Sequence, residues 1–465
     1  MRLLLALIVL AIPFGLQASE PPQSIEEFVD KSWPESGAPG VAYAVIEDGK
    51  VRTGVRGKTL SGGTDEITPD TPFLIGSISK SFAALAIMQL VESEKIDLEA
   101  SVGTYLDAFS DRPSSAITIR QLLSHTSGYS TVQGNSLHGN ASRSEGKLAD
   151  HVADVAQWEP AYAPGERWEY SNANYHVLGA VIEAVSGQDY ASYIEANILR
   201  PLGMDSSFVS DGRIPGKIAI PHRPWFGGKR AYDMGRTTPV GAPAGGIFAS
   251  ANDLALYLAM MLDGEDNIIT AASKSQMLQP ASDASPFYGL GWFIDVEART
   301  ASHSGLVPGT ETLATLVPAD GKGVVVLVNA NGGIGFGENF ELRNGITARA
   351  LNLDYSGEGS RFWPQFTYLM MVSLPIIFAL SAGWAWLRRE QLRAKSGALG
   401  MFSLWFPLIA TSAMAFALIV VVPQMFGGSI GTMLLFQPDF GWAMVAAAVA
   451  GPIWAIVRLT LAYRK

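Results

Sequence analysis

The run I-G-S-I-S-K-S-F, residues 75–82, places Ser77 and Lys80 three positions apart at the start of an apolar stretch. Residues at this spacing share one face of a helix, so the Lys80 amine would lie beside the Ser77 hydroxyl. A helix N-terminus disfavours an ammonium and favours an oxyanion, and burial lowers the pKa of a lysine. A neutral amine would then accept the serine proton, as in an activated nucleophile. The alternative is an ordinary helix start in which Ser77 is only a cap.

A second serine and lysine, Ser144 and Lys147, repeat this spacing in a different setting. They lie in the stretch 130–148, which is rich in Ser, Gly and Asn and which we interpret as a surface loop. No apolar helix follows them, whereas Ser77 comes after the apolar run Phe73–Ile75 and opens a periodic helical pattern. The spacing alone therefore means little, and the context favours Ser77.

Two further patches hold polar residues at spacings that suit chemistry. The run E-R-W-E-Y-S-N-A-N-Y has Tyr170 two positions before Asn172. The run A-S-H-S-G-L has His303 two positions before Gly305 and lies near a predicted strand hairpin. Each patch also has a purely structural interpretation, because Asn172 would serve as a helix cap and His303 would fit an ordinary turn.

Other catalytic templates fit poorly. The stretch Gly427–Gly431 matches the serine turn of α/β-hydrolases, but it lies between two predicted membrane spans and no histidine follows it. The stretch Gly333–Gly337 resembles a dinucleotide-binding loop, but its third glycine comes one residue early and no βαβ unit follows. The six histidines show no H-E-x-x-H or clustered spacing. We therefore predict neither a metal site nor a cofactor.

The elements that must position these residues predict a mixed α/β (α+β) fold. Residues 41–57 contain two strand-like runs around an Asp-Gly turn, and residues 312–330 repeat this arrangement. Helical patterns lie between the two hairpins, including one that starts at Ser81 and one that starts at Asn174 and ends at a glycine. The strands at both ends must meet to bury their faces, which predicts an antiparallel sheet flanked by helices.

The three motifs, S-x-x-K at Ser77, Y-x-N at Tyr170 and H-x-G at His303, occur in one chain order that resembles a known family. This is the serine β-lactamase-related family, which includes class C β-lactamases, D-alanyl-D-alanine carboxypeptidases, D-aminopeptidases and esterases. The resemblance spans about 38–350. Three further stretches are similar to those of the family, namely LLSHTSGY at 122–129, PAGGIFASANDLALYL at 243–258 and YGLGWF at 288–293. The resemblance implies an antiparallel sheet with a mostly helical subdomain inserted between the outer strands.

The resemblance also implies catalytic roles for three residues. Ser77 would be the nucleophile that forms an acyl-enzyme, and Lys80 would share its proton. Tyr170 would act with Lys80 as general base and would then protonate the leaving group. Which residue takes the first proton is left open, because the question is disputed for relatives as well.

The substrate-binding residues follow from the same resemblance. Asn172 would hold the substrate amide, and the backbone N–H groups of Ser77 and Leu306 would form an oxyanion hole. Gly305 belongs to the same motif and would line the site beside Leu306. His303 would lie where many β-lactamases carry a lysine, so carboxylate selection should be weaker than in those enzymes.

The composition excludes several classes of protein. The chain has 465 residues, 48 % of them hydrophobic, and a formal net charge of −10. This acidic balance argues against a nucleic-acid partner, and the length allows a large core and an additional module. The chain has no cysteine, which excludes thiol catalysis, disulfides and cysteine-ligated metal sites.

The two ends of the chain carry membrane signals. Residues 1–18 have one basic residue, Arg2, an apolar run broken at Pro13 and Gly15, and a small residue at Ala18, which together predict a secretory signal peptide. The alternative is an uncleaved membrane anchor. At the other end, three apolar runs at about 366–387, 401–423 and 438–461 are each long enough to cross a bilayer as a helix.

The charges of the connecting loops predict how these helices are oriented. Residues 424–440 carry no Lys or Arg, whereas the first connection and the tail are basic. Their basic residues are Arg388, Arg389, Arg393, Lys395, Arg458, Arg464 and Lys465. The positive-inside rule then places the C-terminus in the cytoplasm and residues 19–360 outside.

These observations predict an outward-facing serine hydrolase in the cell membrane of a bacterium. Residues 19–360 would form the periplasmic or extracellular catalytic domain, and residues 361–465 a membrane module in contact with the lipid bilayer. The substrate would be a small D-amino-acid peptide, a peptidoglycan stem peptide or a carboxylic ester. The alternative is a penicillin-binding or ligand-sensing module with little turnover that signals through its membrane helices. The complete set of Ser77, Lys80 and Tyr170 favours the enzyme, because a binding module does not need all three.

Overall fold

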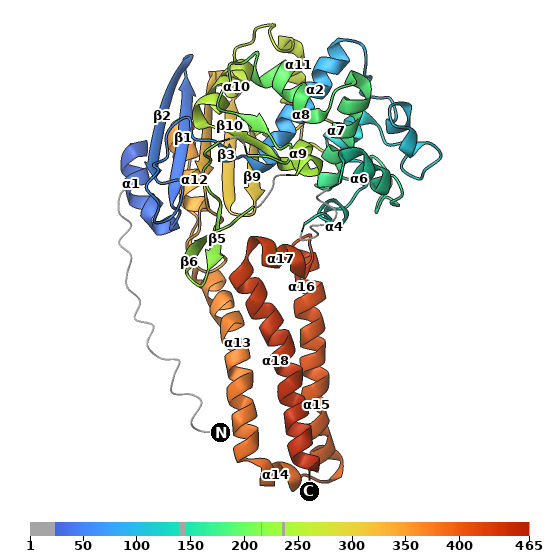
Figure 1. Cartoon of the computed structure of the whole chain (residues 1–465), viewed down its shortest axis with the longest axis vertical. Coiled ribbons are helices and arrows are strands. Elements are labelled where there is room, and N and C mark those ends of the chain that lie inside the picture. The colour runs from blue at the N-terminus through green and yellow to red at the C-terminus, as the bar shows by residue number, and fades with distance from the viewer. Residues whose placement is uncertain (1–23, 139–145, 215, 235–237, 465) are drawn as a thin grey trace.

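The computed structural model describes residues 24–138, 146–214, 216–234 and 238–464. A six-stranded antiparallel sheet of order β2-β1-β11-β10-β9-β8 lies beside a mostly helical subdomain, and a bundle of long helices extends below both (Figure 1). The predicted fold class is confirmed. The strands of the sheet are β1 (Gly40–Glu47), β2 (Lys50–Gly57), β8 (Phe293–Asp295), β9 (Thr300–Val307), β10 (Thr310–Val317) and β11 (Lys322–Val328).

Both predicted hairpins are present. β1 and β2 are joined by Asp48 and Gly49, whose φ angles of 51° and 71° are the left-handed pair that a tight hairpin turn requires. β10 and β11 are joined through a short 3₁₀ turn, and Gly321 with a φ of 62° closes it. β1 also pairs with β11 along its length, so the strands from the two ends of the domain meet as predicted.

Helices cover both faces of the central strands. On β11, Val324, Val326 and Val328 pack against α1 (Ile25–Ser36) and α12 (Phe340–Leu351). The alternate residues of the same strand face the larger core on the other side, where the helical subdomain lies. This two-sided burial explains why the strand is a nearly continuous apolar run instead of an alternating one.

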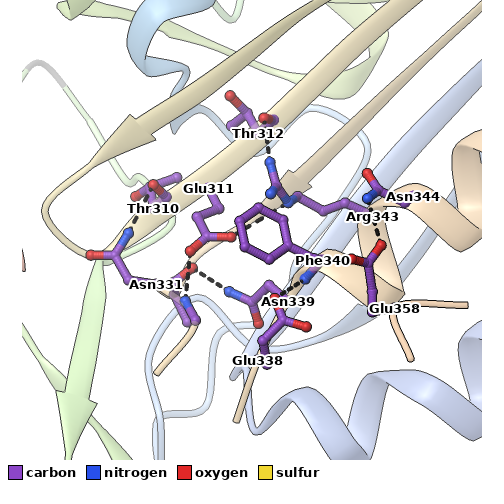
Figure 2. Close-up of polar contacts among 12 residues, drawn as sticks. Thr310, Glu311, Thr312, Asn331, Glu338, Asn339, Phe340, Arg343, Asn344 and Glu358 are labelled. Atoms are coloured by element: carbon purple, nitrogen blue, oxygen red, sulfur yellow. Dashed lines mark hydrogen bonds and ion pairs between the residues drawn. The ribbon is translucent and has the colours of Figure 1, made fainter. Parts of the chain in front are cut away.

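A buried polar cluster connects β10 to α12, as Figure 2 shows. Nε of Arg343 lies 3.4 Å from Oε2 of Glu311, and both residues are buried. Arg343 also donates to the carbonyl oxygen of Thr312 at 3.0 Å, and Oε1 of Glu311 accepts from the N–H of Gly332 at 2.6 Å. Because Glu311 is paired with Leu306 across the β9–β10 ladder, this cluster also fixes the strand that carries the H-x-G motif.

The subdomain contains short strands and most of the helices. One small sheet has the order β3 (Phe73–Leu74), β7 (Ile247–Ala249) and β4 (Phe208–Val209), and β5 (His222–Trp225) pairs with β6 (Gly228–Ala231). The helices are α2 (Ser79–Glu92), α3 (Ile119–Leu123), α4 (Thr131–Gly134), α6 (Leu148–Val155), α7 (Asn172–Ser186), α8 (Tyr190–Ile194), α9 (Ala242–Gly245), α10 (Ala251–Leu262) and α11 (Ala271–Met277).

Two local expectations need correction. The stretch 130–148 is not wholly a loop, because Ser130 and Gln133 form a capping box that starts α4 and because α6 begins at Leu148. Asn172 is the first residue of α7 and Ser171 occupies the cap position, so the interpretation of Asn172 as a cap is wrong. The predicted glycine stop of α7 is confirmed at the residue after Ser186. Ser144 lies outside the described residues.

Three long apolar helices follow, at the predicted places. They are α13 (Phe362–Leu387), the continuous segment Gly397–Met425 and α18 (Pro438–Tyr463), and each is long and apolar enough to cross a membrane. The first two begin at 362 and 397 instead of at 366 and 401. The middle segment comprises α15 (Gly397–Phe416), the π-helical turn η7 (Ala417–Val421) and α16 (Val422–Met425), and the connections contain α14 (Arg389–Arg393) and α17 (Ile430–Phe436).

This helical module, residues 362–463, contacts the rest of the protein at the end where α17 lies (Figure 1). Arg223 of β5 donates to the carbonyl oxygen of Leu435 at 3.0 Å, and the N–H of Phe226 donates to Asp439 at 2.9 Å. The side chain of Gln437 donates to the carbonyl oxygen of Gly332 at 2.7 Å. The module is therefore held against the sheet domain by specific polar contacts. The predicted signal peptide, residues 1–18, lies outside the described residues.

Candidate active site

Ser77 lies in a tight turn between β3 and α2. The 3₁₀ turn η1 (Gly76–Ile78) follows the strand, and α2 starts at Ser79. Gly76 adopts a φ of 57°, which a residue with a side chain rarely adopts. The turn leaves Ser77 partly exposed while its neighbours on both sides are buried. The Ser77 hydroxyl is therefore accessible at the surface, while burial holds the residues on both sides of it in place.

The structure brings the S-x-x-K and Y-x-N residues together around this hydroxyl. Nζ of Lys80 lies 3.0 Å from Oγ of Ser77, and the phenol of Tyr170 donates to the same oxygen at 2.8 Å. Lys80 also donates to Oδ1 of Asn172 at 2.8 Å and to the carbonyl oxygen of Ala244 at 2.6 Å. Three residues from three separate segments are thus hydrogen-bonded to one amine.

The surroundings of Lys80 favour a neutral amine. Its side chain is fully buried, and burial holds the pKa of Lys80 well below its usual value. In the described part of the chain, its hydrogen-bond partners are a hydroxyl, an amide oxygen and a carbonyl oxygen, with no carboxylate among them. The oxygens of Asn172 and Ala244 only accept, so they take the two N–H donors of a neutral amine. In that neutral form, the remaining lone pair would face the hydroxyl of Ser77, which lies 3.0 Å from Nζ.

Tyr170 is held by aromatic neighbours. Its ring packs 4.3 Å from the ring of His125 and stacks at 6.4 Å on Phe293. Burial among these side chains raises the pKa of Tyr170 above its usual value. The phenol therefore keeps its proton at neutral pH and donates it to Ser77. Ser77 is placed between a proton donor and an amine lone pair.

His303 lies close to this cluster but is enclosed. Its Nδ1 faces the carbonyl oxygen of Ser304 at 2.8 Å, so Nδ1 must carry the proton, and Nε2 then accepts from the hydroxyl of Tyr288 at 3.1 Å. Burial lowers the pKa of His303 to about 3. The imidazole is consequently neutral at pH 7 and both of its nitrogen atoms have partners within the protein.

The end of β9 that carries Gly305 and Leu306 approaches the turn that carries Ser77 very closely. A Cβ atom on Gly305 would lie 2.0 Å from the carbonyl oxygen of Ile75, so only glycine fits at this position. A Cβ atom on Gly76 would lie 3.0 Å from the backbone nitrogen of Leu306. The backbone N–H of Leu306 is thus adjacent to the turn that carries Ser77, and the register between β8 and β9 ends before it, at Ser302.

Asn172 connects the cluster to the helical module. Its Nδ2 donates to Oδ1 of Asn135 at 2.8 Å, and Nδ2 of Asn135 donates to the carbonyl oxygen of Gly427 at 2.8 Å. Gly427 lies between α16 and α17 of the helical module. A continuous chain of hydrogen bonds therefore runs from Lys80 to a backbone carbonyl of the module.

Two residues of this region were not singled out in the sequence. Asn135 lies in the stretch interpreted as a loop, and no local pattern marks it. His125 is part of the stretch LLSHTSGY, but its role was not assigned. Its Nδ1 accepts from the N–H of Ser171 at 3.1 Å and from Asn174 at 2.9 Å, which orients it against the Tyr170 ring. A histidine in a motif shared with the family was the available signal.

No metal centre competes with this site in the described part of the chain. Within residues 24–138, 146–214, 216–234 and 238–464, no group of three or more His, Cys, Asp or Glu side chains is placed to hold a metal ion. The prediction that the protein works without a metal stays a prediction.

The fold and the site define a class of protein. The profile of the Beta-lactamase family matches residues 23–343, and the chain belongs to this family. The match covers the sheet domain, the helical subdomain and all the motif residues from Ser77 to Leu306.

Individual proteins and solved structures are also similar to this chain. Protein flp from Staphylococcus aureus (strain MRSA252) is 25 % identical over 429 residues, which are 88 % of this chain and 83 % of that protein. The match to flp from strain N315 covers 63 % of that protein's length. The octameric penicillin-binding protein homologue from Pyrococcus abyssi is 27 % identical with a TM-score of 0.61, covering 71 % of this chain and 77 % of that one. A D-stereospecific amidohydrolase from Streptomyces sp. is 25 % identical with a TM-score of 0.55, covering 66 % of this chain and 93 % of that one.

Proposed function

We propose that this protein is a membrane-anchored serine hydrolase that cleaves an amide or ester through an acyl-enzyme. The observation that carries the proposal is the position of the Ser77 hydroxyl, 3.0 Å from the amine of the buried Lys80 and 2.8 Å from the phenol of Tyr170, together with the lowered pKa of Lys80. This arrangement supplies the base that activates the nucleophile and the acid that protonates the leaving group.

Acylation would involve three proton transfers. As Oγ of Ser77 attacks the substrate carbonyl, Lys80 takes the hydroxyl proton and becomes an ammonium. When the bond to the leaving group breaks, Tyr170 gives its proton to the departing amine or alkoxide and recovers one from Lys80. In deacylation a water molecule attacks the ester carbon, its proton passes to the same pair, and Ser77 is regenerated with its hydroxyl proton.

The N–H groups of Ser77 and Leu306 would stabilise the oxyanion of the tetrahedral intermediate. Their support is the close approach of the Gly76 turn to the end of β9, which puts the two backbone segments side by side. Such preorganised donors supply on the order of 2.7–4 kcal/mol each to transition-state binding. Asn172 would hold the amide group of a peptide substrate from the opposite side.

The proposed substrates are D-amino-acid peptides or amides, peptidoglycan stem peptides and carboxylic esters. The relatives named as a penicillin-binding protein homologue and as a D-stereospecific amidohydrolase support this range. His303 is buried and neutral, so it supplies no charge that would select a substrate with a carboxylate. The setting we propose is the outer side of a bacterial cell membrane, with the hydrolase in residues 19–360 and the anchor in residues 361–465.

Labelling with a fluorophosphonate probe tests the nucleophile directly. Ser77→Ala should abolish labelling and turnover of an ester substrate, whereas Ser144→Ala, at the other S-x-x-K, should leave both intact. Loss of labelling in Ser144→Ala with labelling retained in Ser77→Ala would contradict the assignment.

A ligand sensor stays a second candidate because the hydrogen-bond chain through Asn135 reaches the helical module. Turnover separates the two functions. An enzyme should release many products per labelled site from an ester or a D-alanyl dipeptide, while a sensor should release about one and stay acylated.

The proposed orientation has its own test. A reporter that works only in the cytoplasm should be active when fused after Lys465, and a reporter inserted near residue 432 should be active only outside. The reverse pattern would overturn the proposed orientation and with it the external location of the site.

A further inference from the structure

We infer that the loop between α16 and α17 of the helical module is part of the active site, with Asn135 as the positioning residue that sets the orientation of Asn172. The inference rests on the proposed hydrolase function and assigns the module a role beyond anchoring. It also predicts that substitutions far from Ser77 in sequence alter the acylation step.

The direction of each hydrogen bond in the chain follows from its last member. The carbonyl oxygen of Gly427 only accepts, so Asn135 must present its NH₂ group to it. The Oδ1 atom of Asn135 is then left for Asn172, which must offer its own NH₂ group. Oδ1 of Asn172 consequently faces Lys80. One backbone carbonyl of the module thus fixes both side-chain amides.

The orientation of Asn172 matters for the protonation of Lys80. With Oδ1 toward the amine, Asn172 accepts one N–H of Lys80 and leaves the lone pair for Ser77. With the amide reversed, its NH₂ group would donate into that lone pair and would compete with the Ser77 hydroxyl. The carbonyl oxygen of Gly427 therefore favours the arrangement in which Lys80 can act as a base.

The contact with the module is close and has a second part. Gly427 has a φ of 71°, and a Cβ atom there would lie 2.6 Å from Cγ2 of Thr131 in α4. Thr131 in turn donates its hydroxyl to the carbonyl oxygen of Tyr170 at 2.7 Å. The same loop thus packs on the short helix that holds the backbone of the proposed catalytic tyrosine. Only glycine allows this approach.

A matched pair of glycine substitutions tests the inference in the full-length protein reconstituted in nanodiscs. Gly427→Ala would push the loop away from α4, so the labelling rate by a fluorophosphonate and the kcat for an ester should fall about tenfold, within the range of couplings between residues in contact. Gly397→Ala is the control, because Gly397 lies in the same module with a φ of 68° and has no atom within 4 Å of its Cβ position. It should label at the wild-type rate.

A double-mutant cycle separates positioning from general destabilisation. Asn135→Asp keeps the shape of the side chain but places an oxygen against the Gly427 carbonyl, and it should slow labelling at least as much as Gly427→Ala. Asn135→Asp should not slow labelling further when Asn172→Ala is already present, because the group that Asn135 orients is then missing. Gly427→Ala should keep part of its effect there, because its loop also packs on Thr131, which holds the backbone of Tyr170. If Asn135 had only a structural role, Asn135→Asp would slow labelling by the same factor in the Asn172→Ala variant as in the wild type.

The outcomes distinguish the two claims. If the wild-type protein is not labelled while an independent serine hydrolase is, the proposed function fails and this inference fails with it. If the wild type is labelled and both Gly427→Ala and Asn135→Asp are labelled at the same rate as Gly397→Ala, the hydrolase stands and the inference is overturned. A loss from Asn135→Asp that is undiminished in the Asn172→Ala background would also overturn it. Since Asn135→Asp does not alter the module, a folding defect in Gly427→Ala leaves this test in place.

Discussion

Two regions of the molecule each bury a lysine, and the charges around the two amines differ. At the corner between α10 and α11, Nζ of Lys274 lies 2.7 Å from a carboxylate oxygen of Asp263 and also donates to the carbonyl oxygen of Glu265 at 2.7 Å. In the candidate site, Lys80 is buried to the same degree, but its partners are Ser77, an amide oxygen and a carbonyl oxygen. In the described part of the chain, a carboxylate neutralises the charge of Lys274, whereas no carboxylate is hydrogen-bonded to Lys80.

The difference shows how one residue type acquires two functions. A carboxylate beside a buried lysine stabilises the ammonium, so Lys274 serves as a cation that ties one helix corner together. Without a carboxylate, burial favours the neutral amine, and the nitrogen lone pair becomes available to a proton donor. The first arrangement stabilises the fold. The arrangement around Lys80 would provide a base, and burying an amine in this way lowers the stability of the fold.

Substituting each lysine by methionine should give the largest contrast. Lys80→Met removes the base, so kcat/KM for an ester should fall about 10³-fold, within the range for a lost general base. Lys274→Met should leave kcat/KM within about twofold and should lower the free energy of unfolding by about 1 kcal/mol, since Asp263 is partly exposed. Steady-state kinetics and thermal melting check both. Equal kinetic losses in the two variants would contradict the comparison.

Asn172→Asp would make the Lys80 region resemble the Lys274 region. The new carboxylate would lie about 2.8 Å from Nζ, the present distance to Asn172 Oδ1, and an opposite charge this near should raise the pKa of Lys80. The acidic limb of the pH profile of kcat/KM should therefore move to higher pH. Asn172→Ala is the control, since it adds no charge and should reduce activity without moving the limb upward. An unmoved limb in Asn172→Asp would show that Lys80 is not the titrating base.

The same principle extends to buried histidines and predicts a loss of stability in acid. Burial lowers the folded-state pKa of His125, His176 and His303, to about 3 for His303, whereas an unfolded histidine titrates near 6.5. Between these values the unfolded chain binds more protons, so stability is full above about pH 6.5 and falls as the pH drops toward 3. Each histidine should contribute a slope of about 1.4 kcal/mol per pH unit.

Melting curves between pH 7.5 and pH 5 test this expectation. His303→Gln removes one of the three groups, so its stability should fall less steeply with acid than that of the wild type. Parallel slopes for the two proteins would mean that His303 is accessible to protons in the folded state.

The smallest effect is expected for the substrate preference of His303→Lys. A lysine in an exposed site would attract the carboxylate of a β-lactam or of a C-terminal D-alanine. Position 303 is 1 % exposed, so burial would disfavour the ammonium there as it does at Lys80. The ratio of kcat/KM for substrates with and without a carboxylate should change less than about threefold at pH 7.5. A tenfold increase would show that this position faces the substrate directly.

Local patterns in the sequence were sufficient for much of the architecture. The Asp-Gly turn at Asp48 predicted the β1–β2 hairpin because few residue pairs adopt two left-handed conformations. The three apolar runs predicted α13, the α15–α16 segment and α18 because a membrane span is defined by length and composition alone. The resemblance to the family was carried by Ser77, Tyr170 and His303, which the fold does bring close together.

The protonation states of the site were decided by tertiary structure. The pKa of Lys80 lies well below its usual value because the side chain is fully buried when the surrounding segments pack around α2, and this burial is not visible in S-x-x-K. The enclosure of His303 likewise depends on Tyr288 and the rings around Tyr170. Desolvation depends on every segment that surrounds a group, so it has no local signature in the sequence.

The contact between Asn135 and Gly427 joins residues 292 positions apart, and it too was decided only by the fold. The sequence by itself determined that the chain has a hydrolase-like set of motifs and three apolar helices. It carried no information that the two come into contact, because the packing of the α16–α17 loop against α4 depends on the shape of both folded surfaces and on Gly427, where a Cβ atom would clash with Thr131. This contact makes the helical module a candidate part of the active site.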